Sequence, residues 1–515
     1  MRASRKEQFL FGACAFLLTM PIQSDGAGVI GLNVPGISGP LGSVAALPPP
    51  ADIAAAAGLS DLAEFVDGAF AVFNKTNGSP GPSVSDSQFW LNAGMSASTL
   101  SAGISNPRLL FDPTSDRWVA TEITNDSTNN TILLAVSNSA DPNPSAGNWQ
   151  AVTLAANSAQ QPGYASFPTL GMDANAVYIG TTNLTPPSFA DPQESLFSIP
   201  KADLIAPAGP SLANATVLYG TGGNSDSLGF VLQPAVNLAS VSSSEAILSI
   251  DYNSFGELHR EDLTGTTGPG ATLSAPQTIT VANTQFPTLP RQPDGSGNDP
   301  NTGLESLDDR IASSVYQVGN LVYLINTIGL PTYTPDTPFP SQSAIQWTVL
   351  QLKANSTSVV QQGTIEDPNY DFFDPSICAN AQGAVVIGYD RSGPSNPSGD
   401  VNAYFSVGTT NGMGQITFGS PQQASFSTID DYGLTMASGN PDDQIVPWGE
   451  YSSVTADPSD ANIFWSVQEV PTTSTSWGTQ ITEIIVPEPA TLTIIAMCGS
   501  CVLIQRSRCR RWSSF

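Results

Sequence analysis

The chain has 515 residues, of which 40% are hydrophobic and 12% are charged, with 44 acidic against 16 basic side chains. The apolar share is that of a packed core and excludes a disordered chain, while the net charge of −28 argues against nucleic acid and anionic lipid as partners. Only Cys378 of the five cysteines lies outside the two terminal segments, which excludes a disulfide framework in the body and favours a small buried thiol there.

The first 27 residues have the pattern of a secretory signal peptide. Three basic residues near the start precede an apolar run from Phe9 to Met20, and small residues around 24–28 offer cleavage sites. The apolar run is short for a membrane span. We therefore predict that residues 1–27 are removed on export. A lipoprotein site at Cys14 is the weaker alternative, because little apolar sequence precedes it.

The body repeats one pattern from residue 61 to residue 486. Each copy has a leading Pro or Arg, a strand-like apolar run, a turn containing Asp, Asn or Gly, and a second apolar run. Clear copies begin at Pro107, Pro168 and Pro375, looser ones near Pro234, Arg310 and Tyr451, and an opening unit around Phe65 lacks the proline. Residues 28–60 before it are rich in Gly, Pro and Ala and are predicted to be a flexible leader.

The spacing of the copies predicts an all-β fold of propeller type. From Pro107 onward the starts are separated by 61, 66, 76, 65 and 76 residues, which leaves room for about four strands each. Seven such units predict a seven-bladed β-propeller whose apolar runs are the inner and second strands of each blade. Thr479–Val486 is a plausible last strand, closing against the opening unit near Phe65. An array of β-sandwiches is the alternative, but its units would be longer.

Several phrases of the body resemble secreted bacterial propellers of the sialidase-like superfamily. They are Asp112-Pro113 with Arg117-Trp118, Ser195–Lys201 and Trp448–Ser452, together with a degenerate Asp-box over 139–149. The resemblance implies the propeller architecture. It implies an activity much less, because an Asp-box should recur and only one copy is visible.

Charged residues at the starts of inner strands are the candidate binding residues of a central funnel: Arg108, Asp309, Arg310, Asp374 and Glu450. A sialidase-like enzyme would also need a facing Tyr–Glu pair, and the adjacent Glu450 and Tyr451 would point to opposite faces of a strand. The acids could instead cap turns or pair with the arginines. No catalytic residue is therefore assigned.

Metal and cofactor signals are weak. One histidine and one body cysteine cannot build a standard zinc site, and His259 is expected on a strand, facing solvent. Loop acids at 430–431, 442–443 and 457–460 offer oxygen ligands that suit calcium, without a fixed ligand spacing. We expect no cofactor, with calcium as the possible exception.

The C-terminus has three parts: Pro487-Glu488-Pro489, an apolar stretch from Thr491 to Ile504, and an arginine-rich end. The order resembles the PEP-CTERM sorting signal, which exosortases recognise in bacteria that make extracellular polysaccharide. The resemblance implies an exosortase partner for 487–515, transient membrane anchoring through an apolar transmembrane helix, and cleavage near Pro487. An ordinary tail anchor is the alternative.

These features together predict an exported protein of the cell envelope, cell surface or extracellular matrix. The first hypothesis is a non-catalytic propeller that binds glycan or protein, with extracellular polysaccharide or surface proteins as partners. A sialidase-like or other glycan-active enzyme on the same scaffold is the second, and a structural spacer in the polysaccharide matrix is the third. Convergent charged funnel residues would favour the enzyme, and an apolar plug the spacer.

Overall fold

The computed structural model describes residues 28–487 apart from a set of internal segments: 40–50, 127–129, 157–162, 185–191, 221–227, 240–241, 252–253, 294–301, 331–341, 355, 412–414, 431 and 434–443. The predicted signal peptide and the sorting segment from Glu488 onward lie outside the described residues. No helix among those described is long and apolar enough to cross a membrane.

The described chain is all-β apart from two short helices, α1 (Asp86–Asn92) and α2 (Lys201–Leu204). Its strands form antiparallel groups in chain order. The first three are β2 (Ala54–Ala57), β3 (Asp61–Val66), β4 (Ala69–Asn74) and β5 (Pro80–Ser85); β6 (Ile104–Asp112), β7 (Arg117–Thr124), β8 (Thr131–Ser137) and β9 (Trp149–Ala155); and β10 (Tyr164–Met172), β11 (Ala176–Leu184), β12 (Gln193–Pro200) and β13 (Thr216–Tyr219).

Three of the four later groups differ in their outermost strand. In two of them it is divided into two short strands, and in the last it comes from the start of the described chain. The fourth group is β14 (Phe230–Val236), β15 (Glu245–Ile250) and β16 (Glu257–Thr264), with β17 (Thr272–Leu273) and β18 (Gln277–Thr280) both paired with β16. The fifth is β20 (Val315–Val318), β21 (Leu321–Gly329), β22 (Ser343–Lys353) and β23 (Ser356–Ile365), and the sixth is β24 (Asp371–Ala379), β25 (Ala384–Ser392) and β26 (Asn402–Thr410), with β27 (Ile416–Phe418) and β28 (Gln422–Gln423) both paired with β26. The seventh is β30 (Ser453–Ala456), β31 (Ile463–Thr473), β32 (Ser476–Ile485) and β1 (Val29–Pro35).

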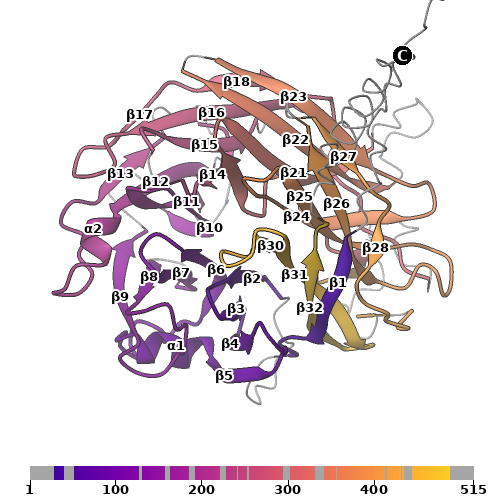
Figure 1. Ribbon diagram of the computed structural model, residues 1–515, viewed down its shortest axis with the longest axis horizontal. Coiled ribbons are helices and arrows are strands. Elements are labelled where there is room, and N and C mark those ends of the chain that lie inside the picture. The colour runs from indigo at the N-terminus through magenta and orange to yellow at the C-terminus, as the bar shows by residue number, and fades with distance from the viewer. Residues whose placement is uncertain are drawn as a thin grey trace, which may run out of the picture.

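The first strands of successive groups lie side by side and close a ring, in the order β2, β6, β10, β14, β20, β24, β30 and back to β2. Figure 1 shows the groups arranged around this common centre. This is the arrangement of a β-propeller, in which each sheet covers the face of its neighbour. The clear repeat copies predicted from sequence supply the inner and second strands, which confirms that part of the prediction and argues against a sandwich array.

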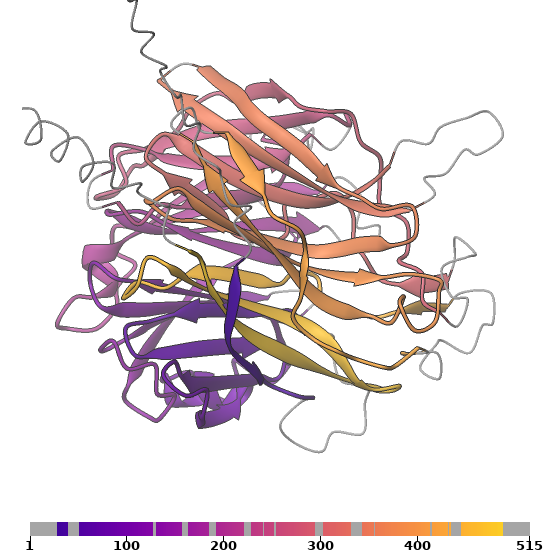
Figure 2. The same ribbon diagram turned by 45° about the vertical axis from the view of Figure 1, so that its right-hand side comes forward.

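The ring is closed by a segment that the sequence analysis assigned to the leader. β1 pairs antiparallel with β32, from Val29 opposite Ile485 to Pro35 opposite Gln480, and Figure 2 shows the indigo strand beside the yellow one. The expected closure onto the unit near Phe65 is therefore wrong. Where they are described, residues 28–60 also supply β2, an all-alanine inner strand whose small side chains suit the crowded centre of the ring.

The leading proline of the clear repeats marks a β-bulge. Asn106, Phe167 and Asp374 each precede a proline and have φ of 57°, 49° and 47°, and the pairing of the innermost strand shifts register there. A positive φ is unfavourable for residues other than glycine, and a bulge redirects side chains locally. These bulges lie where the inner strands begin.

The core consists of apolar side chains packed between adjacent sheets, and the described tryptophans are buried there. Cys378 is fully buried, and burial raises the pKa of its thiol to about 12, in keeping with the predicted small hydrophobe. His259 corrects an expectation: it lies on β16 but is buried, with Nε2 3.2 Å from Asp251 Oδ2. The loop resembling an Asp-box joins the outer strands β8 and β9, and Trp149 Nε1 donates to Pro142 O across it.

Candidate functional site at the charged mouth of the channel

Charged side chains from several groups meet at the end of the ring where the inner strands begin. We call this cluster the charged mouth and define it by five residues: Asp52, Arg108, Arg310, Asp374 and Glu450. Arg310, Asp374 and Glu450 line one small void together. Four of the five funnel residues proposed from sequence thus lie together, while Asp52 was missed because it belongs to the segment taken for a leader.

Arg108 is buried within β6 and holds neighbouring groups together. Its Nε donates to Pro168 O at 2.9 Å and its Nη1 to Ala312 O at 2.8 Å, and its guanidinium carbon lies 3.4 Å from the centre of the Tyr451 ring. An arginine stacked on an aromatic face and bonded to two carbonyls has little freedom to clamp a ligand. Burial lowers the pKa of this guanidinium from its ordinary value.

Arg310 forms an ion pair with Asp308, two residues earlier in the sequence. Its Nε and Nη2 donate to the two oxygens of Asp308, each at 2.6 Å, in a bidentate pair, and its guanidinium carbon lies 4.5 Å from the Phe167 ring centre. Asp308, rather than the predicted Asp309, therefore reaches the void. Asp309 is buried, and its burial together with the charge of Asp308 raises its pKa to about 7.

The carboxyl groups of the mouth are crowded and poorly solvated. Asp374 is buried, and neither of its side-chain oxygens has a hydrogen-bond partner among the described residues. Burial, and then the charge of Asp52, raises its pKa well above the ordinary value. Burial also raises the pKa of Glu450, which is partly exposed and lines the same void. Such groups hold protons more tightly than ordinary carboxyls, and raised pKa values are common at functional sites.

Asn106 ties three of the acids together. Its Nδ2 donates to Asp52 Oδ2 at 2.7 Å and to Glu450 Oε2 at 3.3 Å, and its backbone N–H donates to Asp67 Oδ1 at 2.8 Å. Asn106 and Asp67 were not proposed from sequence. The signal that could have found Asn106 is its place before the repeat's leading proline, where the bulge turns it.

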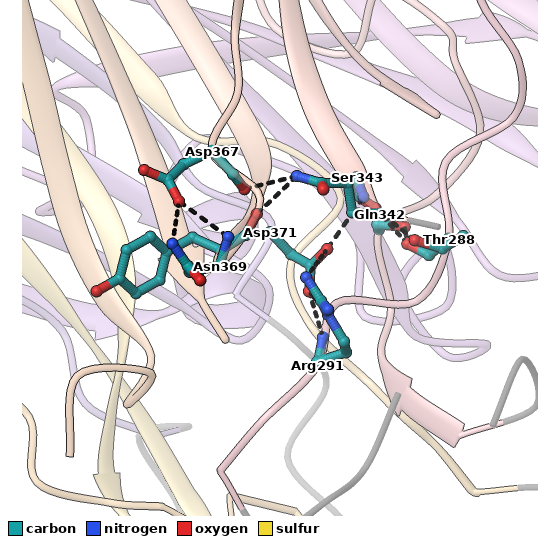
Figure 3. A network of polar contacts seen from close by, with 9 residues as sticks. Thr288, Arg291, Gln342, Ser343, Asp367, Asn369 and Asp371 are labelled. Atoms are coloured by element: carbon teal, nitrogen blue, oxygen red, sulfur yellow. Dashed lines mark hydrogen bonds and ion pairs between the residues drawn. The ribbon is translucent and has the colours of Figure 1, made fainter. Parts of the chain in front are cut away.

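Two long excursions carry Arg310 and Glu450 to the mouth: 281–314, between β18 and β20, and 424–452, between β28 and β30. They meet in a short parallel pair, β19 (Thr302–Leu304) with β29 (Gln444–Val446). The first excursion is fastened to the blades by the network in Figure 3, where Arg291 Nε donates to Asp371 Oδ2 at 2.7 Å.

The same network includes Ser343 at the start of β22, in the group next to that of Asp371. Ser343 N–H donates to Asp371 Oδ1 at 3.1 Å, and Ser343 Oγ donates to Thr288 O on the excursion. Arg291, the buried Asp371 and Ser343 therefore form a structural clamp that fixes the excursion against β22 and β24. This rigidity holds the side chains of the mouth in place.

The space inside the charged mouth is small. The void lined by Arg310, Asp374 and Glu450 has a volume of about 10 Å³, roughly that of one water site. The Tyr451 hydroxyl donates to Pro107 O at 2.8 Å and is buried, so it forms no facing pair with Glu450. In this conformation a sugar ring can contact the rim of the mouth but not its interior.

Exposed aromatic side chains lie at the same end of the molecule. Phe255 and Phe286, 40% and 50% exposed, pack edge to face with ring centres 4.9 Å apart. Phe255 follows the end of β15, where Ile250 pairs with Phe230 at the start of β14. Phe230 lies beside the charged mouth, because the guanidinium carbon of Arg310 is 5.1 Å from the centre of its ring. The pair therefore sits on the face that carries the charged mouth.

The loop acids proposed for calcium are only partly described. Within the described ranges, no group of three or more His, Cys, Asp or Glu side chains is arranged to hold a metal ion. Asp431, Asp442 and Asp443 lie outside those ranges. Asp457 is described, and it pairs with Lys75 Nζ at 2.8 Å.

Comparison with known proteins assigns neither a family nor an activity to the chain. No protein-family model and no curated protein matches the chain. Among solved structures, extracellular domains 1–2 of Drosophila semaphorin 1b share 6% identity at a TM-score of 0.38, covering 90% of this chain and 88% of that one.

Two glycan-active proteins are similar at comparable levels. An endo-arabinase from Bacteroides thetaiotaomicron shares 11% identity (TM-score 0.31, covering 75% of this chain and 94% of that one). Trypanosoma rangeli sialidase, solved with sialic acid, shares 12% (TM-score 0.34, covering 79% of this chain and 56% of that one). These similarities are too distant to transfer a substrate or a catalytic residue.

Proposed function

We propose that this chain is an exported, seven-bladed β-propeller that binds extracellular glycan without hydrolysing it, and that exosortase sorting through residues 487–515 delivers it to the cell surface or matrix. The signal-like start and the Pro-Glu-Pro tail support export and sorting. The ring of antiparallel groups supports seven blades.

The observation that supports binding without hydrolysis is that protein side chains fill the charged mouth and leave no room for a sugar ring. Arg108 is held by two backbone carbonyls, Arg310 is paired with Asp308, and the void beside Asp374 is about the size of one water. Glycoside hydrolysis needs two carboxyl groups with a sugar between them, and in one class also a water. The filled mouth favours recognition at the rim and on the surrounding face.

The surface that we propose for glycan contact is the aromatic pair Phe255 and Phe286. Sugar rings present apolar C–H faces that pack on aromatic side chains, and two rings from adjacent segments offer a broader platform than one. The tryptophans of the described structure are buried, so exposed phenylalanines take that role.

Co-sedimentation of the full chain with the host's extracellular polysaccharide tests this proposal. We expect Phe255→Ser and Phe286→Ser each to weaken retention several-fold, because each removes half of the platform. Leu59→Ser is the control, since Leu59 is also an exposed apolar residue (43%) but follows the end of β2, at the opposite end of the ring. Equal retention of all three variants and the wild type would remove the aromatic pair as the contact surface.

Sorting is tested separately by the mass and location of the mature protein. Replacing Glu488 by Ala should leave the chain unprocessed in the membrane fraction, because the motif that an exosortase would recognise is broken. Glu483→Ala, five residues upstream on β32, is the control. Normal processing of the Glu488→Ala chain would contradict exosortase sorting through this motif.

A glycan-active enzyme is the second candidate, favoured by one observation. Asp374 and Glu450 are two carboxyl groups with raised pKa values that line the same void, and no described residue forms a hydrogen bond with the side-chain oxygens of Asp374. For such an enzyme, these two residues are the acid and base to test.

A further inference from the structure

A second cavity lies at the opposite end of the channel, where the inner strands finish. Its volume is about 340 Å³, within the usual range of small-molecule sites. Its wall includes Phe111, Val236, Tyr316, Cys378 and Ala456, from five of the inner strands or their ends. We call this opening the apolar mouth.

Most polar groups on this wall are engaged within the protein, but Gln317 Oε1 has no hydrogen-bond partner among the described residues. Asp457 is the one charged residue among the described residues that line the cavity, and its carboxylate accepts hydrogen bonds from Lys75 Nζ and Trp465 Nε1. The hydroxyl of Tyr316 donates to Val454 O at 3.2 Å, and Asn380 Nδ2 donates to Ala461 O. The surface left facing the cavity is mainly hydrocarbon, and no described residue of the wall has a free charge to balance a charged ligand.

The apolar mouth is separated from the charged mouth by packed side chains. Between them Ser452 Oγ lies 2.9 Å from Ser376 Oγ, and the void at that level, beside Arg108, is only about 20 Å³. A ligand can therefore reach the large cavity only from the apolar mouth. Leu238, at its edge, is 41% exposed, an apolar side chain of the kind that rims binding sites.

We propose that the apolar mouth binds a neutral, hydrocarbon-rich small molecule. A mainly apolar cavity favours an apolar ligand, because burying such a molecule removes its hydrocarbon surface from water. A charged molecule would lose its hydration without gaining a partner. This site is independent of the glycan-binding face, which lies at the other end of the channel.

Titration of the full chain with the neutral fluorophore N-phenyl-1-naphthylamine tests the proposal. We expect saturable binding of one molecule per chain. Ala456→Phe, which fills the cavity from its wall, and Leu238→Asp, which places a charge at its edge, should each weaken binding about tenfold or more. Leu238→Asp changes a surface residue, so it gives an answer even if Ala456→Phe fails to fold.

Two matched variants control for general effects of the substitutions. Ile205→Asp makes the same kind of change at a residue with 42% exposure outside the cavity, and Ala213→Phe adds a ring to an exposed loop. Both should bind like the wild type. Absence of saturation, or equal binding by all four variants, would overturn the proposal.

One further outcome would assign the cavity to the chain itself. β32 ends at Ile485 opposite Ile463, and the turn before Ile463 begins at Asp457 on the cavity wall, so the described chain ends near this mouth. If a chain ending at Pro487 binds the fluorophore about tenfold tighter than the full chain, the tail fills the cavity and the small-molecule proposal is wrong.

Discussion

Arg108 lies over the ring of Tyr451, with its guanidinium carbon 3.4 Å from the ring centre, while the Tyr451 hydroxyl donates to the carbonyl of Pro107, the residue before Arg108. The two side chains come from β6 and from the segment before β30, which are 343 positions apart in the sequence. Their contact links early and late parts of the ring at its centre. The main role of Arg108 is therefore to stabilise the centre of the ring.

We therefore expect Arg108→Ala to lower the free energy of unfolding by about 3 kcal/mol, because it strands two buried carbonyls and leaves a hole beside Tyr451. Arg108→Lys should lose part of this, since an ammonium cannot bond both carbonyls and stack at once. Denaturant unfolding measures both. Arg117→Ala, which removes a partly exposed arginine, is expected to stay within about 0.5 kcal/mol of the wild type. A similarly small loss for Arg108→Ala would contradict the structural role.

Stability should fall as the pH rises from about 4.5 to 7. Burial raises the pKa of Glu64 from 4.5 to about 7, and that of Glu194 likewise to about 7. The folded state then binds these protons more tightly than the unfolded state. Their stabilisation is full below the unfolded pKa and is lost as the pH rises through the folded pKa, by roughly 3 kcal/mol for each group.

Glu64→Gln tests this directly, because the amide is always neutral. Its free energy of unfolding should depend less steeply on pH than that of the wild type between about pH 5 and 7. Urea unfolding at a series of pH values measures the slope, and Glu483→Gln on the outer strand β32 serves as the control. Identical slopes for wild type and Glu64→Gln would show that the Glu64 carboxyl titrates normally.

The closing strand depends on Asn33. Its Oδ1 accepts hydrogen bonds from Gln480 Nε2 at 2.7 Å and Thr482 Oγ1 at 2.9 Å, and its Nδ2 donates to Ala424 O at 2.7 Å. We expect Asn33→Ala to destabilise the fold by about 1–3 kcal/mol and to expose β1 to proteolysis first. Val29→Ala, at a 57% exposed position of the same strand, should change little. Unchanged resistance to proteolysis would argue against closure by β1.

The regular part of the fold could be predicted because its units carry strong local signals. Apolar runs bounded by Asp, Asn or Gly, such as Pro168–Asp173 followed by Ala176–Gly180, indicate two neighbouring strands wherever they occur. The closing strand could not be predicted in this way. Its partner lies some 450 residues away, and an all-alanine strand such as β2 has no strand propensity of its own, being set by crowding at the centre of the ring.

The candidate site was predictable where its residues share a repeat position. Arg108 and Asp374 flank the leading proline of their copies, so they arrive at the same end of the ring. Asn106 was missed because its hydrogen bonds to the acids depend on the backbone conformation of a β-bulge, which cannot be predicted from the sequence. Asp309 was proposed in place of Asp308 because sequence spacing cannot tell which of two adjacent acids folds back onto Arg310.

The most direct test of the central claim is to incubate the full chain with the host's extracellular polysaccharide and measure reducing-end release together with retention. A binding module predicts retention of the protein with no release above the polysaccharide alone. Release that disappears in Asp374→Asn or Glu450→Gln, with both variants still folded by circular dichroism, would contradict it and make the charged mouth an active site.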